Sequence, residues 1–186
     1  MAEQPETDRR VRKTKQRLNE ALNTLMVEKG YDKVTVQDII NRADVGRSTF
    51  YAHYETKDDL LMSKIEHLKE DMHLALGDAP ALTGPVIRCL PLFSHLSENH
   101  LIFKSMIGSH GIAKVSELVH AGLLQHVTEI LERRSVEGDR HEVPVDVRAG
   151  FLTGSLLALA QWWLDRDMPY SPEQMDEMFQ ALTASA

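Results

Sequence analysis

Cysteine is almost missing from this chain of 186 residues, which contains only Cys89. A single cysteine cannot form an internal disulfide, so a disulfide-stapled secreted module is excluded and a reducing compartment is expected. Aromatic residues make up only 6% of the chain, whereas Leu, Ala, Met, Glu and Gln fill the stretches between glycines. Because these residues favour helices over strands, we expect an all-α fold.

Long apolar runs are also missing. The longest, Ala149–Leu164, is interrupted by Gly, Thr, Ser and Gln, so it is too short and too polar to cross a bilayer. The first ten residues, MAEQPETDRR, lack the apolar core of a secretory signal. We therefore expect a cytoplasmic protein that does not bind a membrane.

The sequence lacks the motifs of common enzymes and metal sites. It contains no G-x-S-x-G, H-E-x-x-H, P-loop or G-x-G-x-x-G pattern, so we expect no enzyme activity. Its nine histidines do not pair at the i, i+4 spacing of helical metal ligands, so we expect neither a metal nor a cofactor. Cys89 has no basic motif beside it and is interpreted as a buried small apolar residue.

Lys and Arg are outnumbered by Asp and Glu, which gives a net charge of -7, but the positive charges are unevenly distributed along the chain. Residues 1–57 carry 11 Lys and Arg against 9 Asp and Glu, whereas residues 58–186 carry 10 against 19. Six cations lie between Arg9 and Arg17, with no acidic residue from there to Glu20. A solvated helix face explains such a run by itself, so the neighbouring sequence must decide whether it binds nucleic acid.

Apolar spacing and helix caps predict nine helices. The N-terminal ones are expected at residues 9–29, 36–43, 47–54 and 57–76, and the later ones at 85–98, 99–107, 112–134, 145–165 and 172–184. Capping boxes are predicted at Thr35 with Asp38, Thr56 with Asp59 and Ser171 with Gln174. Pro91 lies inside one expected helix, so that helix should be kinked or begin later.

The second and third expected helices, with the short turn between them, predict a helix-turn-helix. Apolar residues at 36, 39, 40, 43, 45 and 50 can form its small interior. The remaining polar side chains are types that contact phosphates and base edges: Thr35, Gln37, Arg47, Ser48, Thr49, Tyr51, His53 and Lys57.

The run TVQDIINRADVGRSTFYAHYETKDDLL (35–61) strongly resembles the TetR (tetracycline repressor) family of bacterial transcription regulators, and the resemblance covers about residues 10–62. Three positions depart from the family pattern: Asp44 replaces the usual turn glycine, Gly46 replaces the serine that caps the recognition helix, and Tyr54 replaces a core phenylalanine. Gly can cap a helix and Asp suits turns, so the motif should still fold. The glycine removes one possible phosphate contact.

The resemblance implies a role for each polar residue of the motif. Thr35, Gln37, Tyr51, His53 and Lys57 should contact phosphates. Arg47, Ser48 and Thr49 should face base edges, since they lie on the first turn of the recognition helix.

The segment Gly150–Phe179 looks like the last two helices of many family members, which pair with their copies across a two-fold axis. The dimer interface implied here comprises Phe151, Ser155, Leu159, Trp162, Met175, Met178, Phe179 and Leu182. A ligand pocket between the helices is expected from Met72, His73, Phe93, Met106, His110, His120 and Trp163, although Met and aromatic residues at helical spacing often form plain core.

The resemblance therefore implies a disordered tail at 1–8, a DNA-binding domain at 9–56 with its motif at about 35–54, a connecting helix at 57–76 and a ligand-binding and dimerisation domain at 77–186. The expected function is that of a homodimeric repressor that binds a palindromic DNA operator and is released by a small, mostly apolar effector. The alternative is a dimeric helix-turn-helix protein without an inducer.

Overall fold

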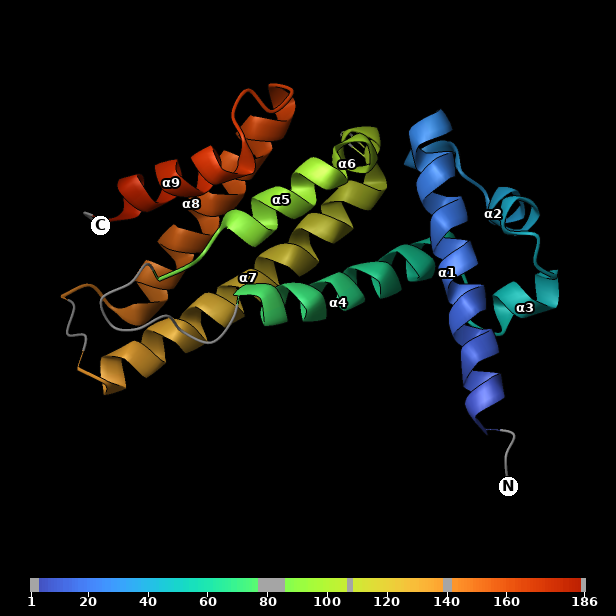
Figure 1. Cartoon of the computed structure of the whole chain (residues 1–186), viewed down its shortest axis with the longest axis horizontal. Coiled ribbons are helices and arrows are strands. Elements are labelled where there is room, and N and C mark those ends of the chain that lie inside the picture. Colours follow the sequence, from blue (N-terminus) through green and yellow to red (C-terminus); the bar gives the residue numbers. More distant parts are fainter. Residues whose placement is uncertain (1–3, 77–85, 107–108, 139–141, 185–186) are drawn as a thin grey trace. The chain divides into compact units, whose positions relative to one another are not determined.

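The computed structural model describes the backbone of residues 4–76, 86–106, 109–138 and 142–184, and their side chains except for those of 4–8, 67–76 and 112. Nine α-helices and one short 3-10 helix occur in this part of the chain, which contains no strand (Figure 1). The all-α expectation is confirmed. No helix among the described residues is long and apolar enough to span a membrane.

The chain divides into two compact units that alternate along the sequence. The first contains Met1–Glu66 and Leu101–Val115, and the second contains His67–His100 and Ser116–Ala186. The expected domain boundary near residue 77 is therefore not where the units divide. Residues 101–115 belong to the first unit because they contact Tyr31, Asp32 and Asp58 there.

The first unit is built on α1 (Gln4–Lys29), which packs against α2 (Val36–Ala43). It also contains the 3-10 helix η1 (Tyr31–Lys33), α3 (Arg47–Tyr51), the beginning of α4 (Lys57–Leu76), most of α6 (His100–Met106) and the beginning of α7 (His110–Val136). Its core is formed by apolar side chains at helical spacing along α1 and α2 and by one aromatic residue each of η1 and α3: Leu18, Leu22, Leu25, Met26, Tyr31, Ile39, Ile40 and Phe50.

The second unit contains α5 (Leu90–Glu98), α8 (Val145–Asp165), α9 (Pro172–Thr183) and the remaining parts of α4 and α7. Helix α5 packs against α9. Two polar contacts support this packing: the Cys89 amide donates to the Asp176 carboxylate over 2.8 Å, and the Gln180 amide donates to the Ile87 carbonyl over 2.7 Å. Burial raises the pKa of the Cys89 thiol, consistent with its interpretation as a buried apolar residue.

The observed helix limits agree with the expected ones at α2, α4 and α8, and differ elsewhere. Helix α1 begins at Gln4, so residues 4–8, expected to be disordered, are helical, whereas residues 1–3 lie outside the described part. Helix α5 begins at Leu90 because Pro91 occupies its first turn, which is the later start that the proline predicted. Helix α7 is longer at both ends than expected, and the capping boxes at Thr35 and Ser171 are present.

Candidate DNA-binding surface

The helix-turn-helix is formed by α2 and α3 with a three-residue turn between them. Helix α2 ends where Asp44 adopts a left-handed conformation, with φ of 49° and ψ of 55°. This backbone turn lets Val45 donate to the Ile40 carbonyl over 3.2 Å, and Gly46 then caps α3 without a side-chain hydrogen bond. Asp44 therefore occupies a conformation that glycine adopts at lower cost.

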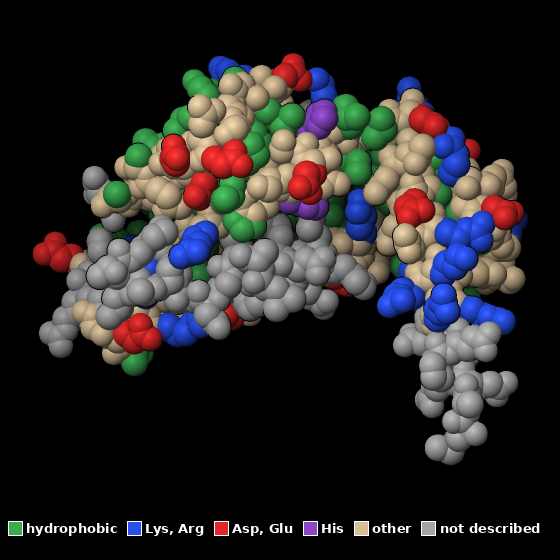
Figure 2. Space-filling model, in the orientation of Figure 1, with side chains coloured by type: hydrophobic (Ala, Val, Ile, Leu, Met, Phe, Trp, Pro, Cys, Tyr) green, Lys and Arg blue, Asp and Glu red, His purple; other side chains and the backbone are tan. Residues whose placement is uncertain are grey.

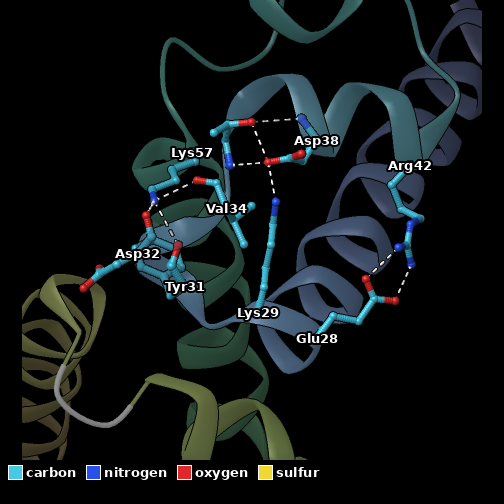
Figure 3. Close-up of polar contacts among 9 residues, drawn as sticks. Glu28, Lys29, Tyr31, Asp32, Val34, Asp38, Arg42 and Lys57 are labelled. Carbon is cyan, nitrogen blue, oxygen red and sulfur yellow. Dashed lines mark hydrogen bonds and ion pairs between the residues drawn. The ribbon is translucent and has the colours of Figure 1, made fainter.

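The start of α2 is fixed by a carboxylate that accepts three hydrogen bonds. Asp38 Oδ2 lies 2.6 Å from Lys29 Nζ, 2.5 Å from Thr35 Oγ1 and 2.8 Å from the Thr35 amide (Figure 3). Lys29, followed by the two Thr35 donors, holds the pKa of Asp38 well below its usual range. The first turn of α2 is thereby joined to the last turn of α1.

A second ion pair joins the last turn of α2 to the same last turn of α1. Both Arg42 guanidinium nitrogens donate to the Glu28 carboxylate, at 2.9 and 2.7 Å, in a bidentate arrangement (Figure 3). Both ends of α2 are therefore held by polar contacts to the last turn of α1, in addition to the apolar packing between the two helices.

Lys57, which is predicted to contact a phosphate, is bonded to the backbone of its own chain. Its ammonium group donates to the backbone carbonyls of Tyr31, Asp32 and Val34 at 2.9, 3.1 and 2.9 Å, and lies 4.5 Å from the centre of the Tyr31 ring (Figure 3). A lysine has three N–H donors, and all three are used here. The side chain therefore positions the start of α4 against η1, and only the helix terminus remains to attract phosphate.

The predicted reading residues lie on the surface at the start of α3. Arg47 and Ser48 are exposed and Thr49 is half-buried, so the structure brings the three together on one turn. Tyr51 is 49% exposed and its ring packs edge-on against Phe50. Helix α3 ends at Tyr51, three residues earlier than expected, so His53 lies in the following turn, half-buried beside Tyr54.

The two predicted residues of α2 are exposed but already bonded. The Thr35 hydroxyl both accepts from the Asp38 amide and donates to the Asp38 carboxylate, so it caps the helix. The Gln37 amide donates to Asn41 over 2.8 Å within the same helix. These bonds are local and exposed, and Gln37 can exchange its bond for a phosphate contact more readily than Thr35.

Sequence reasoning missed a cluster around Tyr31. The Tyr31 hydroxyl donates to Asp58, and Asp58 also pairs with Lys114 of α7, which lowers the pKa of Asp58. A Cβ on Gly111 would lie 2.6 Å from the Tyr31 ring, so only glycine fits there. The partners are 27 to 80 positions apart, and no local pattern in the sequence signals them.

The predicted pocket residues are divided between the two units, and the pocket itself stays a prediction. Met106 and His110 belong to the first unit, where His110 is exposed beside Asp32. Phe93 and Trp163 are buried in the second unit with ring centres 5.4 Å apart, while His120 is exposed on α7. The side chains of Met72 and His73 lie outside the described residues. No group of three or more His, Cys, Asp or Glu side chains suited to a metal occurs among the described residues.

The predicted dimer residues fall into two groups. Met175 and Phe179 are 0% and 2% exposed, because they face the core of their own chain against α5, so they leave no surface for a partner. The others are at least partly exposed: Phe151, Ser155, Leu159, Trp162, Met178 and Leu182.

Comparison with known proteins agrees with a helix-turn-helix unit followed by a helical C-terminal region. The family model described as bacterial regulatory proteins, tetR family, matches residues 19–63, and the one described as a transcriptional regulator C-terminal region matches residues 88–185. The second match spans more than half of the chain. The two matched segments together contain the helix-turn-helix and α5, α8 and α9 of the second unit.

Individual relatives are also regulators. An HTH-type transcriptional regulator of Bacillus subtilis (strain 168) is 34% identical over 76 residues, which are 39% of this chain but only 20% of that protein. The HTH-type transcriptional repressor DhaR of Mycobacterium sp. (strain GP1) is 25% identical over 92% of this chain and 93% of its own.

Among solved structures, a TetR-family transcriptional regulator from Syntrophomonas wolfei has a TM-score of 0.75 at 21% identity, covering 92% of this chain and 93% of that one. The chain is thus a member of the TetR family of bacterial transcription regulators, with a DNA-binding N-terminal domain, and is not an enzyme.

Proposed function

We propose that the protein is a repressor that binds a palindromic operator as a homodimer and leaves it when a small, mostly apolar ligand binds. The observation that carries the DNA-binding half of this proposal is the first turn of α3, with Arg47 and Ser48 exposed and Thr49 half-buried, which follows a helix α2 held at both of its ends to the last turn of α1. An arginine at this position can pair with a guanine in the major groove.

The repressor role is supported by one relative that matches over nearly its full length and is named a transcriptional repressor. A reporter gene placed behind the protein's own operator tests this role. The operator is first selected from a library of random DNA duplexes with the full-length protein. Expression that falls when the protein is supplied supports repression, whereas expression that rises identifies an activator.

The homodimer is supported by an exposed apolar face on α8. Val147 and Phe151 are 56% and 53% exposed, and Trp162 continues the same face at 37%. Gly150 and Gly154 lie on this helix with open space where a Cβ would stand, so a second backbone can approach closely. Self-complementary pairing of this face generates a two-fold axis, and the operator is then a palindrome.

Ligand release is supported by the course of α4 and α7, since each is one helix with residues in both units. A ligand that shifts either helix in the second unit also acts on the first. By linkage, a ligand that weakens DNA binding is itself bound more weakly by the DNA complex, by about 5- to 150-fold for a coupling of 1–3 kcal/mol.

A ligand-free regulator is the second candidate, favoured by the packing of Phe93 against Trp163 in a filled part of the core. Screening apolar compounds by Trp fluorescence, followed by operator titration, separates the two. A compound that binds with 1:1 stoichiometry and weakens operator binding supports the inducible repressor. Stoichiometric binding without any effect on the operator contradicts the coupling.

A further inference from the structure

We propose that the N-terminal part of α1 is a second DNA-contacting surface, which binds phosphates beside the groove that α3 enters. The surface consists of Arg9, Arg12 and Lys13, and it is called the α1 basic surface below. This inference rests on the DNA-binding role of the N-terminal domain and adds to it a set of contacts outside the helix-turn-helix.

The α1 basic surface lies on a regular helix rather than on a loose tail. Helix α1 begins at Gln4, so all three cations are more than one turn inside it. At 100° per residue, Arg9, Arg12 and Lys13 fall within an arc of about 100°, on the side away from the buried Leu18 and Leu22. All three side chains are exposed, and Figure 2 shows Lys and Arg side chains gathered over this part of α1.

An ion pair connects this surface to the helix-turn-helix. Arg17, on the next turn of α1, pairs with Asp44 at 3.1 Å, and Asp44 stands in the turn that leads into α3. Arg17 is therefore engaged in an ion pair with Asp44, and for this reason it is not counted in the α1 basic surface. Lys13 lies about 6 Å and Arg9 about 12 Å further along the helix axis from Arg17, at 1.5 Å per residue.

These spacings match the dimensions of DNA. The major groove is about 12 Å wide, so cations at about 6–12 Å from the turn reach the phosphates that border a groove holding α3. Arg9 and Lys13 are about 6 Å apart along the helix axis, which corresponds to about two nucleotides along one strand. Contacts of this kind add affinity and salt dependence without adding sequence preference.

The experiment compares two charge-matched double variants of the full-length protein. Arg9→Gln with Lys13→Gln removes two cations of the α1 basic surface. Arg88→Gln with Arg133→Gln removes two exposed cations of the second unit and serves as the control. The probe is a duplex selected from random DNA with the wild-type protein, and folding is checked by circular dichroism.

In a homodimer the α1 double variant loses four phosphate contacts, two in each half-site, which should reduce the slope of log K against log salt by about 3.6. Raising the salt concentration fourfold should therefore weaken the wild-type protein about 150-fold more than the α1 double variant. Hydroxyl-radical footprints of this variant should lose a block of about two protected sugars in each half-site. The control should keep both the slope and the footprint, and sequence preference should be the same in all three proteins.

An α1 double variant with the wild-type slope and footprint overturns this inference, because its cations then face solvent or another partner. A result in which the wild-type protein selects no duplex at all instead contradicts the DNA-binding role itself. The two failures are therefore distinguishable.

Discussion

Lys57 makes contacts within its own chain that its place in the motif does not reveal. Its ammonium group closes the last turn of η1 by binding three backbone carbonyls, two of which are partly buried. Replacement by methionine keeps the length of the side chain but leaves these acceptors without their donor. Unsatisfied buried acceptors cost about 1–3 kcal/mol in total.

We therefore expect Lys57→Met to lower the free energy of unfolding by about 1–3 kcal/mol, measured by urea denaturation, with little change in the salt dependence of DNA binding. Lys33→Met is the control, because Lys33 is an exposed lysine of η1, the short helix that Lys57 contacts. Unchanged stability together with a salt slope lowered by about 2, from one lost contact in each protomer of the dimer, would support the phosphate contact.

Asp44 is a second residue with a testable effect on stability, because its backbone adopts a left-handed conformation. Its φ of 49° is a left-handed value that a side chain disfavours. Its ion pair with Arg17 is exposed and contributes little. Asp44→Gly should raise the free energy of unfolding by about 0.5–1 kcal/mol in chemical denaturation. Asp44→Ala keeps the Cβ and loses the carboxylate, so it should show no gain; a gain in both variants would trace the effect to the carboxylate instead.

At the scale of the helix, the missing cap of α3 has a measurable consequence. Gly46 has the extended backbone of a cap residue, and a Cβ there would lie 3.5 Å from Thr49 Oγ1, an ordinary contact. Gly46→Ser should therefore stabilise the protein by a few tenths of a kcal/mol and add a hydroxyl beside the DNA. We expect binding to strengthen on all duplexes alike in a gel-shift titration.

Gly46→Ala supplies the comparison for that change, because alanine fills the same space without a capping oxygen. It should lower stability and leave affinity per folded molecule unaltered. If alanine strengthens DNA binding as much as serine, the hydroxyl is not responsible.

Most helices could be predicted from sequence because their limits depend on neighbouring residues. Thr35 and Asp38, or Ser171 and Gln174, carry the whole capping box within four positions. The contacts that fix the helices on one another could not be predicted, since Asp58 meets Lys114 and Gly111 meets Tyr31 across 56 and 80 positions. The same reason explains why the backbone contacts of Lys57 and the burial of Met175 and Phe179 could not be predicted.

At the scale of the whole molecule, the exposed face of α8 is the place to test dimerisation. Phe151→Glu puts a carboxylate at the centre of this face in each protomer, and an unpaired charge buried in an interface costs roughly 3–5 kcal/mol. We expect sedimentation to show a monomer at concentrations where the wild-type protein is a dimer. Because Phe151 is 53% exposed, the chain itself should stay folded.

Val136→Glu is the matched control, since Val136 is 89% exposed at the end of α7. A carboxylate at Phe179 would not serve, because that side chain lies in the core and its replacement would unfold the protein. Sedimentation of Phe151→Glu as an unaltered dimer would place the interface on another surface.

The alternation of the two units along the chain limits how the molecule can be divided. A fragment that stops at Leu76 carries every DNA-reading helix, yet it lacks Gly111 to cover the Tyr31 ring and Lys114 to pair with Asp58. No single protease cut or gene truncation can therefore release the first unit alone, because residues 67–100 of the second unit lie between its two segments. Anyone who transplants the DNA-reading helices into a hybrid regulator must also bring residues 101–115, or replace Tyr31 and Asp58 by side chains that tolerate water.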